Sequence, residues 1–304
     1  MSSASSQPSA STRLLTATPP EALFIASAAA QYAGAVIAVN LFDDLSPATI
    51  AWIRVLSAGV ILGVFSLRQR HTSWTRRDVA WASAFGIATA LMNMFFYLAL
   101  DYLPLGKGVT IEFIGPIAVA AIMTRSLRNT YALVLATIGV VVLGGAELGN
   151  EPLGLLFILL ASAMWAGYIV IGSRVALGDR GVAGLAIGLI VGGMVITPFA
   201  STDASTAFST PSLLFSCVLI GLLSNVIGYG IDQTTLRRIP IRRFSVMLAL
   251  LPVTAAVFGF IFLQQTPTAL DLTGMAFVLI GVSVQERDVV ARHQSEVQTA
   301  KRSL

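Results

Sequence analysis

The stretch Leu91–Ala121, LMNMFFYLALDYLPLGKGVTIEFIGPIAVAA, decides the fold and contains the main candidate residue. It consists of two apolar segments that are separated by a short loop rich in proline and glycine. The second segment carries a carboxylate, Glu112, which is followed by Gly115 and Pro116. A central Asp, Lys or Arg in a membrane-spanning helix costs roughly 2.5–3.5 kcal/mol on insertion scales. Such charges usually face a helix-bundle interior or a watery cavity, so we expect function near Glu112.

The composition indicates an all-α polytopic membrane protein. Of the 304 residues, 56% are hydrophobic and only 11% are charged, and the mean hydropathy is +0.81. Soluble domains carry about 25% charged residues. The apolar segments are mostly about 18–22 residues long, which matches the roughly 20 residues that one helical span needs. The net charge of +4 is therefore a signal of membrane topology and indicates no nucleic-acid partner. The partners that we expect are the lipid bilayer and a small-molecule substrate.

The sequence predicts ten membrane-spanning helices with both termini in the cytoplasm. We expect the helices at residues 21–40, 46–67, 78–100, 104–124, 130–146, 153–173, 183–200, 211–232, 240–262 and 269–286. With the amino terminus inside, seventeen of the nineteen Lys and Arg residues lie in cytoplasmic segments. This bias satisfies the positive-inside rule. The two exceptions are Arg54, inside a span, and Lys107, at the outer start of the fourth span.

A shared offset of 136 residues indicates that the chain is an inverted repeat. It pairs Pro104 with Pro240, and Pro116 with Pro252. It also pairs Gly145 with Gly281, and Lys107 with Arg243. Each unit has five spans, an odd number, so the two units must enter the bilayer in opposite senses. Such repeats are a hallmark of secondary transporters, which hold their substrate near the membrane midplane. Chance among apolar helices rich in glycine and proline is the alternative explanation.

The same reading divides the chain into two repeats and two tails. Residues 21–146 form the first five-helix repeat, and residues 152–286 form the second. Residues 1–20 are rich in Ser, Thr, Ala and Pro and lack an apolar segment, so we expect a disordered cytoplasmic tail. Residues 287–304 are polar and are expected to be a second cytoplasmic tail.

Two opposite charges, Arg54 and Glu112, are expected at similar depth in the membrane. Each lies eight residues into a span that starts on the outer side, which places it roughly 12 Å deep. They form a structural ion pair, or they bind a zwitterion, with Glu112 holding the ammonium and Arg54 or Lys107 the carboxylate. A third interpretation makes Glu112 a proton carrier, although a nearby Arg54 would disfavour its protonated form.

Polar and aromatic side chains recur in the middle of four other predicted spans. They are Gln31 and Tyr32, Asn93 and Tyr97, Trp165 and Tyr168, and Asn225 and Tyr229. The Asn/Tyr pairs have i,i+4 spacing, so the two residues of each pair share one helix face. The asparagines either bond neighbouring helices or face the substrate, and the aromatic residues either pack in the core or line a cavity.

Proline residues interrupt two of the predicted spans at matching positions. Pro116 and Pro252 each lack an amide hydrogen and kink a helix. The kinks either are static or belong to gate helices that bend during transport. The sequence contains no P-loop and no hydrolase motif, and its two histidines lie in cytoplasmic segments, so it indicates no enzyme, no cofactor and no metal site. It leaves the oligomeric state, monomer or homodimer, open.

The combined features resemble the drug/metabolite transporter superfamily, in its EamA-type branch. Within that branch, Met92–Ala121 resembles the threonine/homoserine exporters. The matching pieces are Met92-Asn93, Phe96-Tyr97-Leu98, Pro104-Leu105-Gly106, Glu112-Phe113, Gly115-Pro116, Trp165-Ala166, Tyr168-Ile169, Leu236-Arg237-Arg238-Ile239-Pro240 and Arg243-Phe244. The resemblance implies a bacterial inner-membrane exporter of amino acids and related metabolites that works by alternating access through a central cavity. The alternatives are efflux of lipophilic cations and, more remotely, a non-transporting scaffold or sensor.

Overall fold

A computed structural model describes residues 18–67, 74–123, 126–145, 151–175, 181–228, 231 and 250–284, and these residues are helical with short connections. The helices before the middle of the chain are α2 (Pro20–Val39), α3 (Pro47–Ser66), α4 (Arg76–Leu100), α5 (Leu105–Glu112), α6 (Ile114–Met123) and α7 (Leu127–Gly145). Those after it are α9 (Pro152–Val175), α10 (Gly181–Ala200), α11 (Ala204–Ser209), α12 (Pro211–Gly221), η1 (Leu222–Gly228), α15 (Leu250–Leu263) and α16 (Ala269–Val284). The prediction of an all-helical membrane protein is confirmed over this part of the chain.

Eight helical segments of the described chain are long and apolar enough to cross a membrane. One of them combines α5 with α6 over Leu105–Met123, and another combines α12 with η1 over Pro211–Gly228. Two further apolar helices, α15 and α16, are shorter. The start of the ninth predicted span, residues 240–249, and the predicted tails before residue 18 and after residue 286 lie outside the described residues.

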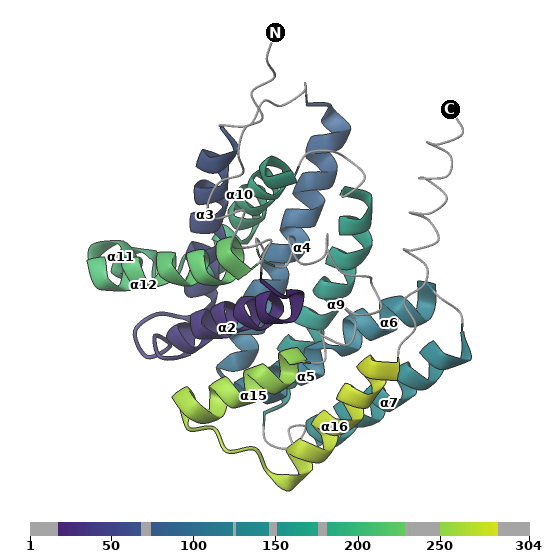
Figure 1. The fold of residues 1–304 in the computed structure, drawn as a ribbon. Helices are drawn as coiled ribbons and strands as arrows, with labels where there is room; N and C mark the ends of the chain where they lie inside the picture. Colours follow the sequence, from purple (N-terminus) through teal and green to yellow (C-terminus); the bar gives the residue numbers. More distant parts are fainter. Residues whose placement is uncertain are drawn as a thin grey trace, which may run out of the picture.

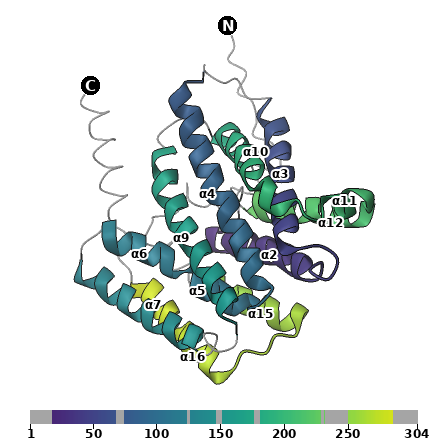
Figure 2. The same cartoon turned by 180° about the vertical axis from the view of Figure 1, so that it is seen from behind.

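Four helices stand side by side in the order α9, α4, α10 and α3 (Figure 1). Figure 2 shows the same group from behind, with α7 and α16 lying against each other beside it. Glycines bring the backbones together: a Cβ on Gly86 of α4 would overlap the backbone of Gly188 in α10. Transmembrane helices associate largely through such van der Waals contact between small residues.

Local signals set several helix boundaries. Thr75 and Asp78 form a capping box at the start of α4, and the Ser46 side chain accepts a hydrogen bond from the Thr49 amide at the start of α3. Pro20, Pro47 and Pro211 occupy the first turn of their helices, where no amide hydrogen is needed. The short helix α11 lies in a segment that we expected to be a loop.

Candidate functional site

The fourth predicted span is broken at Glu112. Helix α5 ends at this residue and α6 begins two residues later, at Ile114. Pro116 has no amide hydrogen, so it cannot donate to the carbonyl of Glu112 four residues earlier. The Ser162 hydroxyl of α9 donates to this carbonyl instead, at 2.8 Å. Gly115 lets α9 approach, because a Cβ there would overlap the Ser162 carbonyl. The Gly-Pro pair thus explains the break that carries the carboxylate.

The Glu112 side chain is buried close to a buried cation. Glu112 is 8% exposed and Arg54 of α3 is 6% exposed. In the described part of the chain, these two side chains form no ion pair within 4.0 Å, but their charges still interact over a longer distance. The two predicted residues therefore lie in one region without a direct ion pair between them.

Arg54 instead contacts residues from two other helices. Its Nε donates to Oδ1 of Asn225 in η1 at 2.6 Å. Its guanidinium carbon lies 5.0 Å from the ring centroid of Tyr97 on α4, which is a cation–π contact. Three predicted site residues, far apart in sequence, are therefore brought into direct contact.

Two polar groups of this cluster have no partner in the described structure. The Tyr97 hydroxyl and the Asn225 Nδ2 are both buried and make no hydrogen bond to any described residue. Both side chains are fully buried, at 0% exposure. Buried polar groups are normally hydrogen-bonded, and an unpaired one costs roughly 1–3 kcal/mol, so a ligand or water is expected here.

The predicted residues on α2 lie along neighbouring helices. Gln31 lies against Gly228 of η1, and its Nε2 donates to the Ser27 hydroxyl at 3.1 Å. Ser27 in turn donates to the Gly228 carbonyl at 2.9 Å. Tyr32 packs against Phe258 of α15, with ring centroids 6.4 Å apart. These contacts place Gln31 and Tyr32 at the seam between α2 and the later helices.

The other predicted residues have mixed surroundings. Trp165 packs edge-on against Phe113, directly after Glu112, with ring centroids 5.0 Å apart. Tyr168 packs against Phe85 at 4.5 Å, and Asn93 donates to the Thr89 carbonyl of its own helix at 2.7 Å. Tyr229 lies outside the described residues. Pro252 is buried in the first described turn of α15, and the residues before Leu250 are likewise outside them.

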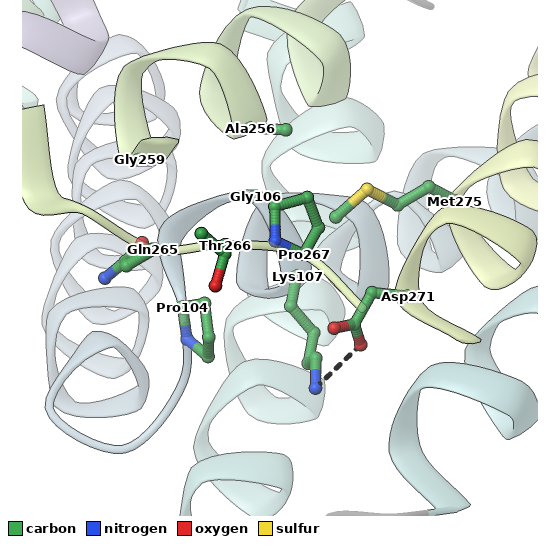
Figure 3. A pocket seen from close by; sticks show the side chains of 10 residues that line it. All are labelled: Pro104, Gly106, Lys107, Ala256, Gly259, Gln265, Thr266, Pro267, Asp271 and Met275. Carbon is green, nitrogen blue, oxygen red and sulfur yellow. Dashed lines mark ion pairs between the residues drawn. The ribbon is translucent and has the colours of Figure 1, made fainter. Parts of the chain in front are cut away.

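A second polar region lines a small pocket of about 110 Å³ at the starts of α5 and α16 (Figure 3). Lys107 and Asp271 point toward each other and form an ion pair, with Nζ and Oδ1 2.8 Å apart. Both side chains are largely buried, at 9% and 12% exposure. The segment between α15 and α16 covers the start of α5, where the Leu105 amide donates to Oε1 of Gln265 at 2.9 Å.

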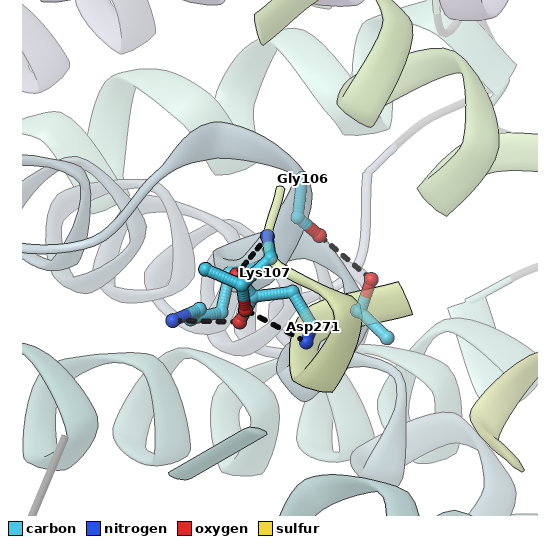
Figure 4. A network of polar contacts seen from close by, with 5 residues as sticks. Gly106, Lys107 and Asp271 are labelled. Carbon is cyan, nitrogen blue, oxygen red and sulfur yellow. Dashed lines mark hydrogen bonds and ion pairs between the residues drawn. The ribbon is translucent and has the colours of Figure 1, made fainter. Parts of the chain in front are cut away.

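Asp271 has a second role at the start of its own helix. Its Oδ2 accepts hydrogen bonds from the Thr268 amide and hydroxyl at 2.9 and 2.8 Å, and its amide donates back to the Thr268 hydroxyl at 3.2 Å. Figure 4 shows this network continuing through Lys107. One carboxylate therefore both caps α16 and ties it to α5.

Sequence reasoning missed two of these features. The Thr268-x-x-Asp271 spacing is a capping signal that could have placed Asp271 in the first turn of the last span, on the side of Lys107. The role of Ser162 had no such signal, because it depends on a carbonyl fifty residues away.

Comparison with known sequences gives consistent matches. The sequence model of the EamA-like transporter family matches twice, at residues 19–148 and 152–285. The chain is 29% identical to the threonine/homoserine exporter RhtA of Salmonella typhimurium strain SL1344, over 88% of this chain and 92% of that protein. It is likewise 29% identical to RhtA of Escherichia coli K12, over 86% and 88%. The uncharacterized inner membrane transporter YedA of Escherichia coli K12 is 22% identical over 71% and 74%.

A solved structure shares the fold. This crystal structure matches with a TM-score of 0.57 at 16% identity, and the match covers 87% of this chain and 95% of that one. At this identity the likeness supports the arrangement of helices.

Proposed function

We propose that this chain, which belongs to the EamA-like transporter family, is a secondary transporter that exports amino acids and related metabolites. The predicted resemblance to this family is confirmed, and the protein is a multi-pass protein of the bacterial inner membrane. Threonine and homoserine are the first substrates to test, because the relatives at 29% identity are named as their exporters.

The proposed architecture is ten spans in two inverted halves, 21–146 and 152–286, with both termini in the cytoplasm. The two separate family matches support this division. Helix contacts support it as well, because α3 and α7 each pack against the corresponding helix of the second half, α10 and α16. Two contacts between the halves also occur in both directions. Helix α4 packs against α9 as α12 packs against α2, and α6 packs against α9 as α15 packs against α2.

The observation that carries the proposal is the contact of Arg54 with Asn225, close to Glu112. Arg54 belongs to the first half and Asn225 to the second, so the hydrogen bond joins the two halves within the buried region. A buried cation and a buried carboxylate that do not pair directly suit a zwitterion. In this proposal Glu112 holds the ammonium, and the aromatic pair of Phe113 and Trp165 forms an adjacent wall.

Alternating access requires that each end of the protein opens in turn. We assign the outer closure to the ion pair of Lys107 and Asp271, since it joins helices of the two halves at the predicted outer side. The break at Phe113 gives α6 a hinge relative to α5, and Pro116 prevents the helix from re-forming its own bond there.

The test is counterflow of radiolabelled L-threonine and L-homoserine into proteoliposomes that hold the purified protein. Excess unlabelled amino acid inside should accelerate uptake of label well above that of protein-free vesicles. Repeating the assay with an imposed pH gradient distinguishes proton exchange from facilitated diffusion. The alternative, efflux of lipophilic cations, predicts no amino-acid exchange and an uptake of labelled tetraphenylphosphonium that unlabelled tetraphenylphosphonium inhibits. An acidic residue beside aromatic rings can bind such a cation.

A further inference from the structure

We propose that Arg54, Tyr97 and Asn225 form a binding site for the free carboxylate of the transported amino acid. This inference rests on the proposed function and deepens it, because it defines the substrate class as amino acids whose carboxylate is unmodified. The three residues come from α3, α4 and η1, and their contacts define one buried cluster.

The groups that remain unsatisfied in this cluster are donors. Oδ1 of Asn225 already accepts a hydrogen bond from Arg54, which leaves Nδ2 as the free group of the amide. The Tyr97 hydroxyl proton likewise has no acceptor in the described structure. The guanidinium of Arg54 carries five N–H donors and no acceptor. A ligand that completes the cluster must therefore offer several acceptors within a small volume.

The charge of the cluster further restricts the ligand. A buried guanidinium is stable only when it is paired and hydrogen-bonded, and a neutral amide oxygen and an aromatic face supply only part of that compensation. A carboxylate supplies the missing negative charge and has two oxygens with about four acceptor sites. A neutral carboxamide supplies one oxygen and brings its own donors, which would face the donors of the protein.

The position of Asn225 is fixed from two sides. The neighbouring Ser224 hydroxyl donates to the Gln31 carbonyl of α2 at 3.3 Å. On the other side, a Cβ on Gly221 would come within 2.7 Å of the Arg54 carbonyl, so α12 and α3 are in close contact. Asn225 itself lies in a π-helical turn, a feature that is frequent at functional sites. These contacts hold the donors in place before a ligand arrives.

The experiment compares a carboxylate with its amide in variants that lack one donor. Counterflow of labelled L-threonine into proteoliposomes is competed with unlabelled L-threonine or L-threoninamide, which share the ammonium and the side chain. In the wild type the amide should need at least about a tenfold higher concentration for half inhibition. The Tyr97→Phe variant lacks only the hydroxyl. In this variant the concentration of L-threonine needed for half inhibition should rise by about tenfold or more, and that of L-threoninamide should stay the same. Tyr131→Phe, at an exposed tyrosine of α7, is the matched control and should change neither.

A second measurement does not depend on transport. Saturating L-threonine should raise the unfolding temperature of the detergent-solubilised wild type, and this shift should shrink in Tyr97→Phe and Arg54→Lys. If the wild type exchanges L-threonine but L-threoninamide competes as well as L-threonine does, the carboxylate site is overturned while the proposed function stands. If Tyr97→Phe weakened inhibition by L-threonine and by L-threoninamide in the same proportion, the carboxylate site would be overturned too. A wild type that exchanges no amino acid would overturn both this inference and the proposed function.

Discussion

Ser162 donates its hydroxyl to the carbonyl of Glu112 at 2.8 Å, at the point where Pro116 removes the donor that a continuous helix would supply. The bond joins α9 to the break between α5 and α6. It thereby positions the backbone of the residue to which we assign the substrate ammonium.

Ser162→Ala should destabilise the protein, because it leaves the Glu112 carbonyl buried and unpaired at a cost of about 1–3 kcal/mol. We expect a lower unfolding temperature in detergent. Ser283→Ala is the matched control, since the exposed Ser283 hydroxyl bonds only the Leu279 carbonyl of its own helix. In a Pro116→Ala background residue 116 regains an amide hydrogen, so the loss caused by Ser162→Ala should be smaller. Equal losses in both backgrounds would disprove this explanation of the break.

Gly86→Ala should disrupt the contact of α4 with α10. The added Cβ would overlap the backbone of Gly188, which cannot yield as a flexible side chain can, and overpacking costs about 1–3 kcal/mol or more. Gly63→Ala in α3 is the control, since a Cβ there meets nothing within 4 Å, and alanine favours a helix over glycine. The unfolding temperature of Gly86→Ala should therefore fall, and that of Gly63→Ala should rise or stay the same. A tolerated Gly86→Ala would show that the helices pack less closely.

Asp271→Asn should weaken the outer end of the protein. Removing one member of a buried ion pair costs about 3–5 kcal/mol, because Lys107 keeps its charge. The asparagine still offers an oxygen to Thr268, so loss of the helix cap contributes little. The double variant Lys107→Met/Asp271→Asn should regain most of the lost stability, which distinguishes charge pairing from capping.

The same pair can be tested as a closure. In a Cys217→Ser background, a cysteine at Thr266 in the pocket should react faster with a membrane-impermeant thiol reagent when Asp271 is replaced by Asn. Unchanged labelling would argue against the outer-closure role.

The sequence predicted the helices better than their interruptions. Apolar length and basic loops placed segments close to α2, α3, α4 and α7, because burial in a bilayer depends on local composition. The π-helical turn around Asn225 and the helix α11 left no such local signal. Glu112 and Arg54 were predicted at similar depth from their distance along each span. That Arg54 contacts Asn225 and Tyr97 could not be predicted, because these contacts depend on how α3, α4 and η1 pack.

The most direct test of the central claim is L-threonine counterflow with Glu112→Gln beside the wild type. Glutamine keeps the size of the side chain but cannot supply the negative charge that an ammonium requires. We predict that the wild type exchanges L-threonine. The Glu112→Gln variant should keep the wild-type unfolding temperature, and its exchange rate at subsaturating L-threonine should be lower by at least about tenfold. A folded Glu112→Gln that exchanges L-threonine at the wild-type rate would contradict the role assigned to Glu112 and with it the zwitterion site.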